Sequence, residues 1–210
     1  MIFREIHQWA VLPKKHVADL GSARERRQIL RQNFVHLRAE RQPQFCPPWV
    51  QGATLGWRIF SPIDVTLSPL DQIEIAGGDF VEASARAVGK RQIWTRGDAT
   101  IALDPPSWLN SYEFETDDGN QSMFLPNGLG TIEWRQGWTV EGWDDFGLLI
   151  VPSPQIPNLG VEIGLLSPAT LERIMPKGIS IAVAPRCKVE IRRGDEIARL
   201  IPISRECMSL

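Results

Sequence analysis

The chain has 210 residues, 43% of them hydrophobic and 23% charged, which is typical of a globular protein with a buried core rather than of a disordered one. Its formal net charge of −2 gives no overall attraction to nucleic acid or to an anionic membrane surface. The three cysteines form no Cys-x-x-Cys pair, no signal-peptide pattern opens the sequence, and no apolar run reaches the length of a membrane span. We therefore expect a soluble protein in a reducing, cytoplasmic setting, without a metal site, a cofactor or a membrane partner.

The first long element that the sequence predicts is a helix. Residues 1–15 are predicted to be extended, and after them Ser22 and Glu25 have the Ser-x-x-Glu spacing of a capping box. Leu30, Phe34 and Leu37 then recur at i, i+4 and i+7, the spacing of one apolar helix face. The pattern predicts a single amphipathic helix of about 12–18 residues between 22 and 40. It divides the chain into an N-terminal segment, residues 1–41, and a β-rich domain, residues 42–210.

The exposed side of this predicted helix is rich in arginine. It carries Arg24, Arg26, Arg27, Arg31, Arg38 and Arg41. Arginines attract phosphates regardless of base sequence, but Glu25 and Glu40 intervene here and no aromatic stacking platform is interleaved. We expect a solvated face, or one that docks an acidic protein partner, rather than a nucleic-acid site.

From Gln42 onward, short apolar runs alternate with turns rich in Pro, Gly, Asn and Asp. The runs predict strands over residues 55–61, 65–67, 72–75, 92–95, 100–103, 112–116, 130–134, 147–152, 161–166, 179–184, 188–191 and 196–203. Many short strands with frequent turns predict a mainly β fold, a jelly-roll or β-clip-like sandwich or barrel. We expect the one N-terminal amphipathic helix to pack outside this β fold.

The last two predicted strands flank a corner at Gly194-Asp195, which predicts a β-hairpin. Pro202, near the end of the second strand, suggests an edge position, because proline has no N–H to donate to a neighbouring strand. Exposed edge strands would allow a homo-oligomer.

Three segments resemble a family of domains of unknown function found in bacteria and in T4-like phages of cyanobacteria. They are Cys46-Pro-Pro-Trp-Val-Gln-Gly-Ala-Thr-Leu-Gly-Trp57 with Ser61-Pro-Ile-Asp64, then Gly142–Pro154, and finally Arg193-Gly-Asp-Glu-Ile-Ala-Arg-Leu-Ile-Pro202. The resemblance covers residues 42–205 and implies a bacterial or phage-infected host cell. Since the family has no assigned activity, the resemblance implies no catalytic residues. The chain departs from the family at Gly164–Ala169, where relatives carry acidic residues.

Gly194–Ile201 also resembles the closing strand of the dUTPase and dCTP deaminase β-clip fold. Those enzymes use a water-activating Asp and a Ser-rich phosphate loop after a Pro-Arg pair. Here Pro185-Arg186 is followed by Cys187-Lys188, so this resemblance implies a similar backbone shape and not hydrolysis.

The strongest candidate ligand site is the acidic loop with Glu141, Asp144 and Asp145, set beside Trp138 and Trp143. Aromatic rings next to carboxylates can stack on a planar ring or a sugar and accept hydrogen bonds from it. The alternative is a solvated loop whose tryptophans close one end of the β core.

A second candidate joins Trp57 and Arg58 to Asp64 at the following corner, and one interpretation is that the two charged residues form a pair at a cleft. The alternative is an exposed ion pair worth under about 1 kcal/mol. Cys46 precedes two prolines, which predicts an extended backbone that does not open a helix, and hence a structural thiol. All histidines lie before residue 40, which excludes a histidine metal site within the β core.

These patterns leave three hypotheses open. The first is a non-catalytic binding or assembly module, favoured because no nucleophile–base set and no metal spacing occur. The second is an enzyme that acts on a nucleotide-like or sugar-like small molecule through the loop carboxylates. The third is a phage virion structural protein, which the family resemblance alone suggests.

Overall fold

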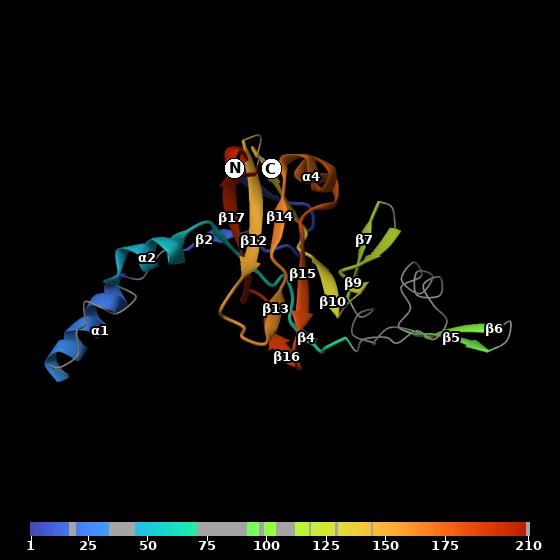
Figure 1. Ribbon diagram of the computed structural model, residues 1–210, viewed down its shortest axis with the longest axis horizontal. Helices are drawn as coiled ribbons and strands as arrows, with labels where there is room; N and C mark the ends of the chain where they lie inside the picture. The colour runs from blue at the N-terminus through green and yellow to red at the C-terminus, as the bar shows by residue number, and fades with distance from the viewer. Residues whose placement is uncertain are drawn as a thin grey trace.

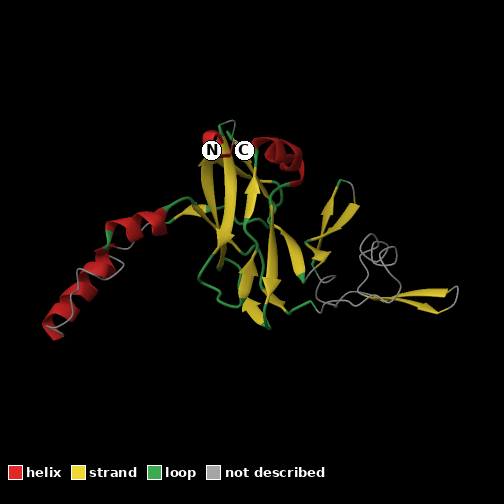
Figure 2. Ribbon diagram, in the orientation of Figure 1, coloured by secondary structure: helices red, strands yellow, loops and turns green. Residues whose placement is uncertain are grey.

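The computed structural model describes residues 1–16, 20–33, 45–70, 92–96, 99–103, 112–117, 119–128, 130–143 and 145–208. Strands are the commonest regular structure in this part of the chain (Figure 2), and they pair antiparallel. The prediction of a mainly β fold is therefore confirmed. Both large sheets have open edges, so the described strands form sheets rather than a closed barrel. The predicted strand 72–75 lies outside the described residues.

The larger sheet has five strands (Figure 1). Their order is β14 (Gly164–Leu166), β12 (Phe146–Pro152), β17 (Glu196–Ser204), β3 (Trp57–Phe60) and β2 (Lys14–Lys15). The second sheet has the order β13 (Leu159–Val161), β15 (Ser180–Pro185), β10 (Thr131–Arg135) and β9 (Phe124–Gly128). The run predicted as one strand over 161–166 is thus two short strands, because the chain crosses from one sheet to the other at Glu162 and Ile163.

Four strand pairs stand beside these sheets. They are β1 (Ile2–Glu5) with β11 (Trp138–Glu141), β4 (Val65–Leu67) with β16 (Val189–Ile191), β5 (Gln92–Arg96) with β6 (Ala99–Leu103), and β7 (Glu113–Thr116) with β8 (Gly119–Ser122). The pair β1–β11 joins the beginning of the chain to the acidic loop that follows Glu141.

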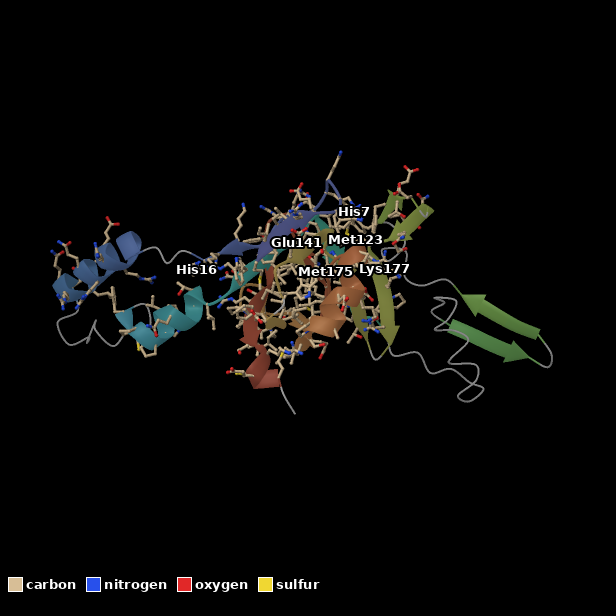
Figure 3. All side chains as sticks on the ribbon, turned by 90° about the horizontal axis from the view of Figure 1, so that it is seen from above. His7, His16, Met123, Glu141, Met175 and Lys177 are labelled. Carbon is tan, nitrogen blue, oxygen red and sulfur yellow. The ribbon has the colours of Figure 1, made fainter. Side chains whose placement is uncertain are left out.

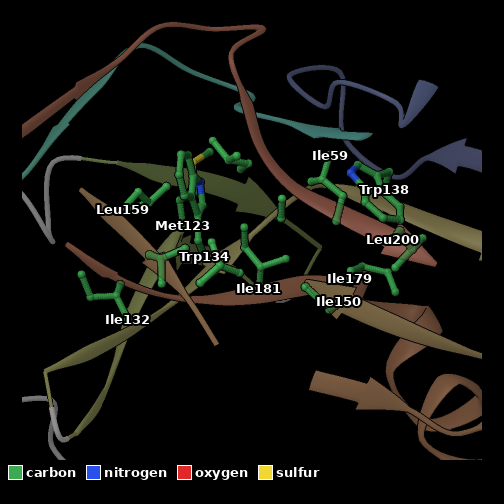
Figure 4. Close-up of a cluster of buried hydrophobic side chains, with 14 of the residues drawn as sticks. Ile59, Met123, Ile132, Trp134, Trp138, Ile150, Leu159, Ile179, Ile181 and Leu200 are labelled. Atoms are coloured by element: carbon green, nitrogen blue, oxygen red, sulfur yellow. The ribbon is translucent and has the colours of Figure 1, made fainter. Parts of the chain in front are cut away.

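One hydrophobic core lies between the two large sheets (Figure 4). Alternate residues of β10 and β15, including Trp134 and Ile181, are buried from one side. Ile59 of β3, Ile150 of β12 and Leu200 of β17 are buried from the other. This period of two places the intervening side chains on the outer faces of the sheets.

The predicted C-terminal hairpin is wrong. β16 pairs with β4, whereas β17 pairs with β3 and β12. The Gly194-Asp195 turn is tight, since Asp195 N–H donates to the Arg192 carbonyl over 3.0 Å, but it leads the chain from one sheet into another.

The β3–β4 connection makes the same change of sheet, and the two corners are bonded to each other. Ser61 N–H donates to the Asp195 carbonyl, and Gly194 N–H donates to the Ser61 carbonyl, each over 2.9 Å. Two segments about 130 positions apart in the sequence therefore change from one sheet to another at the same place. They are Trp57–Leu67 and Val189–Ser204.

The described helices are α1 (Leu20–Asn33), α2 (Pro47–Thr54) and α4 (Pro168–Ile174), with 3-10 turns η4 (Met175–Lys177) and η5 (Arg205–Met208). α1 overlaps the predicted helix, whose Phe34 and Leu37 lie outside the described residues. The prediction of only one helix is wrong. Cys46 has the expected extended backbone, yet it is the N-cap of α2, because proline is favoured at the first position of a helix.

Candidate functional site

The acidic loop does not gather its predicted residues around one point. The Glu141 carboxylate, about half exposed, pairs with Arg4 over 2.9 Å across the β1–β11 pair. Asp145 is exposed, and its carbonyl accepts the N–H of Arg205 over 3.1 Å. Asp144 lies outside the described residues. The two described acidic residues thus have different local contacts: the carboxylate of Glu141 pairs with β1, and the backbone carbonyl of Asp145 bonds to η5.

The tryptophans near this loop are packing residues. Trp138 is fully buried, and the Phe3 ring packs edge-on against it with centroids 5.4 Å apart. The other edge-on contact of Phe3 is with Trp57, over 5.5 Å. Trp143 is partly buried against the same core. The structure therefore brings Trp57 and Trp138 together through Phe3, and full burial leaves Trp138 no face for a ligand at the surface.

Asp64 and Arg58 do not pair with each other. The Asp64 carboxylate accepts the backbone N–H of Arg193 over 2.8 Å, at the point where the two bonded corners meet. The Arg193 side chain crosses to the N-terminal segment and donates to the carbonyls of Trp9, over 2.6 Å, and of Pro62. Asp64 and Arg193 thus hold the corners and the beginning of the chain together.

Arg58 instead pairs with Glu196, a residue that sequence reasoning did not select. The Glu196 side chain is only 4% exposed, although it is an ionisable group at the start of β17. Its Oε2 lies 2.9 Å from Arg58 Nε, and its Oε1 accepts from Arg199 Nε over 2.9 Å and from the Ser153 hydroxyl over 2.8 Å. A carboxylate so deeply buried is stable only with such partners.

The field of the two arginines extends to His16, at the end of β2. Partial burial, followed by the positive charges of Arg58 and Arg199, lowers the pKa of His16, while Glu196 acts in the opposite direction. His7 lies on the other side of the strands (Figure 3), and its pKa is also lowered, first by partial burial and then by Arg135.

The β7–β8 hairpin presents acidic side chains to solvent. Phe114 anchors it, with its ring centroid 4.7 Å from that of His7 and 5.1 Å from that of Trp9. Because neighbouring residues of a strand point to opposite faces, Glu113 and Glu115 point away from this anchor, and both are exposed. With the exposed Asp117 they form what we call the acidic hairpin.

Helices α1 and α2 extend away from the strands, at the opposite end of the molecule from β7 (Figure 1). We call them the α1–α2 arm. α1 contains four arginines and one glutamate, a net charge of +3. No residue of the apolar α2 is buried: Trp49 is 53% exposed, and Leu55, directly after the helix, is 52% exposed.

Within the described ranges, no group of three or more His, Cys, Asp or Glu side chains is arranged to hold a metal ion. Cys46 is half-buried, and Cys187 and Cys207 are exposed; all three are free thiols. The helices that the structure describes are all too short or too polar to span a bilayer.

Comparison with known proteins gives no relative. No protein-family model matches the chain, and neither a curated protein nor a solved structure matches it significantly. The resemblance to the family of unknown function therefore stays a prediction.

Proposed function

We propose that the protein is an assembly module that joins to a second copy of itself, with the α1–α2 arm of one copy against the acidic hairpin of the next. The observation that carries this proposal is α2, an apolar helix without a single buried residue. Large exposed apolar side chains such as Trp49 of α2 and Leu55 directly after it are typical of a protein contact surface.

Charge complementarity supports a second copy as the occupant. The arm begins with a helix of net charge +3, and the acidic hairpin carries three described carboxylates and no basic residue. Opposite charges at the two ends would steer two copies into a head-to-tail orientation. Because these two surfaces differ, their contact is heterologous, and it produces a ring or an open chain of copies.

Light scattering coupled to size-exclusion chromatography, over a series of protein concentrations, tests the proposal. We expect mass to rise with concentration and to fall with added salt, since salt screens exposed charges. Trp49→Ala should shift the series toward the monomer, because tryptophans contribute strongly to interfaces. A protein that stays monomeric at every concentration would refute self-assembly.

Charge reversal identifies the two surfaces. The arm variant R24E/R26E and the hairpin variant E113R/E115R should each weaken association on the order of tenfold, given up to about 1 kcal/mol for each exposed pair. The combination of both variants in one chain should restore it, because the signs are then complementary again. Reversal of exposed charges on α4 and η4, R173E/K177E, is the matched control and should change nothing.

Edge-strand pairing is the other route to an oligomer. β14 is the free edge of the five-stranded sheet, and its Leu165 is 49% exposed beside Ile163. It has only three residues, and short edge strands pair poorly with other chains. If Leu165→Lys gave monomers while R24E/R26E did not, β14 rather than the arm would be the contact.

A further inference from the structure

A row of basic side chains crosses three neighbouring strands of the five-stranded sheet. Lys14 of β2 is the direct partner of Arg58 in β3, and Arg58 is the direct partner of Arg199 in β17. Directly opposed residues share a face of the sheet. Since Ile59 and Leu200, the next residues of β3 and β17, are buried in the core, the row lies on the outer face.

The Glu196 carboxylate contacts each of the two arginines at a single atom, the side-chain Nε. It pairs with the Nε atoms of Arg58 and Arg199, both at 2.9 Å. In the part of the chain that the structure describes, the terminal Nη groups of both guanidinium ions have no hydrogen-bond partner. The two side chains are 23% and 19% exposed, so their Nη groups are held in place and can still be reached from solvent.

We infer that this row is a binding site for a phosphate group. Two guanidinium ions and one ammonium ion face a single carboxylate, which leaves two positive charges without compensation. A phosphate monoester carries nearly two negative charges at neutral pH, and its oxygens match the paired Nη groups of arginine. Burial is the first cause of the lowered pKa of His16, and the positive charges of Arg58 and Arg199 add to it at this place.

The neighbouring residues indicate what else the ligand contains. Val151 of β12 continues the row beyond Arg199, and the adjacent row consists of Leu165, Leu149 and Ile201. The residues Val151, Leu149 and Ile201 are partly exposed and lie outside the core cluster. A phosphate ester with an apolar or aromatic substituent would cover these side chains, so it should bind more tightly than inorganic phosphate.

Isothermal titration calorimetry with inorganic phosphate, at an ionic strength held constant with chloride, tests the site. Lys14→Gln should weaken phosphate binding severalfold, and Arg199→Lys at least tenfold, because lysine keeps a charge beside Glu196 but lacks the fork of Nη groups. Lys188→Gln, an exposed lysine before β16, is the matched control and should bind as the wild type does. Phenyl phosphate should bind several times more tightly than inorganic phosphate, and acetate more weakly than either.

Nuclear magnetic resonance gives a second readout in the unmodified protein. Added phosphate should shift the ring signals of His16, which neighbours the row, and leave those of His7 in place. The inference is overturned if phosphate gives neither heat nor a His16 shift. It is also overturned if Lys14→Gln binds phosphate as tightly as the wild type, a variant that leaves the core untouched even if Arg199→Lys does not fold.

Discussion

Gly56 lies where the α1–α2 arm meets β3, and Gly56→Ala should be strongly destabilising. The residue has a φ of +72°, and an added Cβ would lie 2.1 Å from the Leu200 carbonyl oxygen and 3.2 Å from the Cα of Ile201. A left-handed backbone costs an alanine about 1–2 kcal/mol. Relief of the overlap with the β17 backbone costs a further 1–3 kcal/mol, on the order of an overpacked core site. We therefore expect Gly56→Ala to lower the free energy of unfolding by about 2–5 kcal/mol.

Gly52, four residues earlier within α2, is the matched control. A Cβ at Gly52 would meet nothing within 4 Å. Alanine is favoured over glycine in a helix by up to about 1 kcal/mol, so Gly52→Ala should leave stability unchanged or raise it slightly. Urea unfolding followed by tryptophan fluorescence measures both variants. If Gly56→Ala unfolded at the wild-type midpoint, the close packing of Gly56 on β17 would be incorrect.

Two further predictions follow from the buried charge and from the histidines. Glu196→Gln should lower the free energy of unfolding by about 2–3 kcal/mol. This is less than the loss expected when a fully buried ion pair is broken, because the two arginines are partly exposed. Ser153→Ala removes only one hydrogen bond and should lower the free energy of unfolding by about 1 kcal/mol. Because His7 and His16 have lowered pKa values in the folded state, the unfolded chain takes up their protons first as pH falls below 6.5. The stability linked to these two histidines should thus be complete well above pH 6.5 and be lost as pH falls through their lowered folded-state pKa values. His7→Gln should reduce that loss below pH 6.5, and an unchanged pH profile of the unfolding free energy would count against this reasoning.

The strands were predictable because each one is a local pattern. The apolar residues of β12, β15 and β17 alternate or run together within seven or so positions, and their turns carry Pro, Gly, Asn and Asp. Strand pairing was not predictable in the same way. The Gly194-Asp195 turn has the composition of a hairpin, yet its strands pair with β4 and β3, whose residues lie about 130 positions away.

Pro202 illustrates the same limit. β17 is an interior strand, and its pairing with β3 ends at Leu200, so Pro202 faces only β12. The sequence suggested correctly that one side of Pro202 lacks a partner, but not that the rest of the strand is in the centre of the sheet.

The candidate site was predictable only in part. Arg58 was selected from its position in an apolar strand, but it was paired with the nearest acid, Asp64, because sequence distance was the only guide. Glu196 gives a similar signal, because it is a lone carboxylate at the first position of the apolar run 196–203. It was not selected because it directly follows the Gly194-Asp195 turn and so resembled a loop residue. The available clue to the Arg58–Glu196 pair was that two apolar strands each contain a charged residue, and that the two charges are opposite.

The central position of β17 has a consequence for synthesis of the protein on the ribosome. It is the last of the described strands to be translated, yet it separates β12 from β3 in the finished sheet. Until residues 196–204 emerge, the nascent chain holds two apolar strands with open hydrogen-bonding edges, a state that favours aggregation or capture by a chaperone. Completion of the sheet therefore waits for translation to pass this segment.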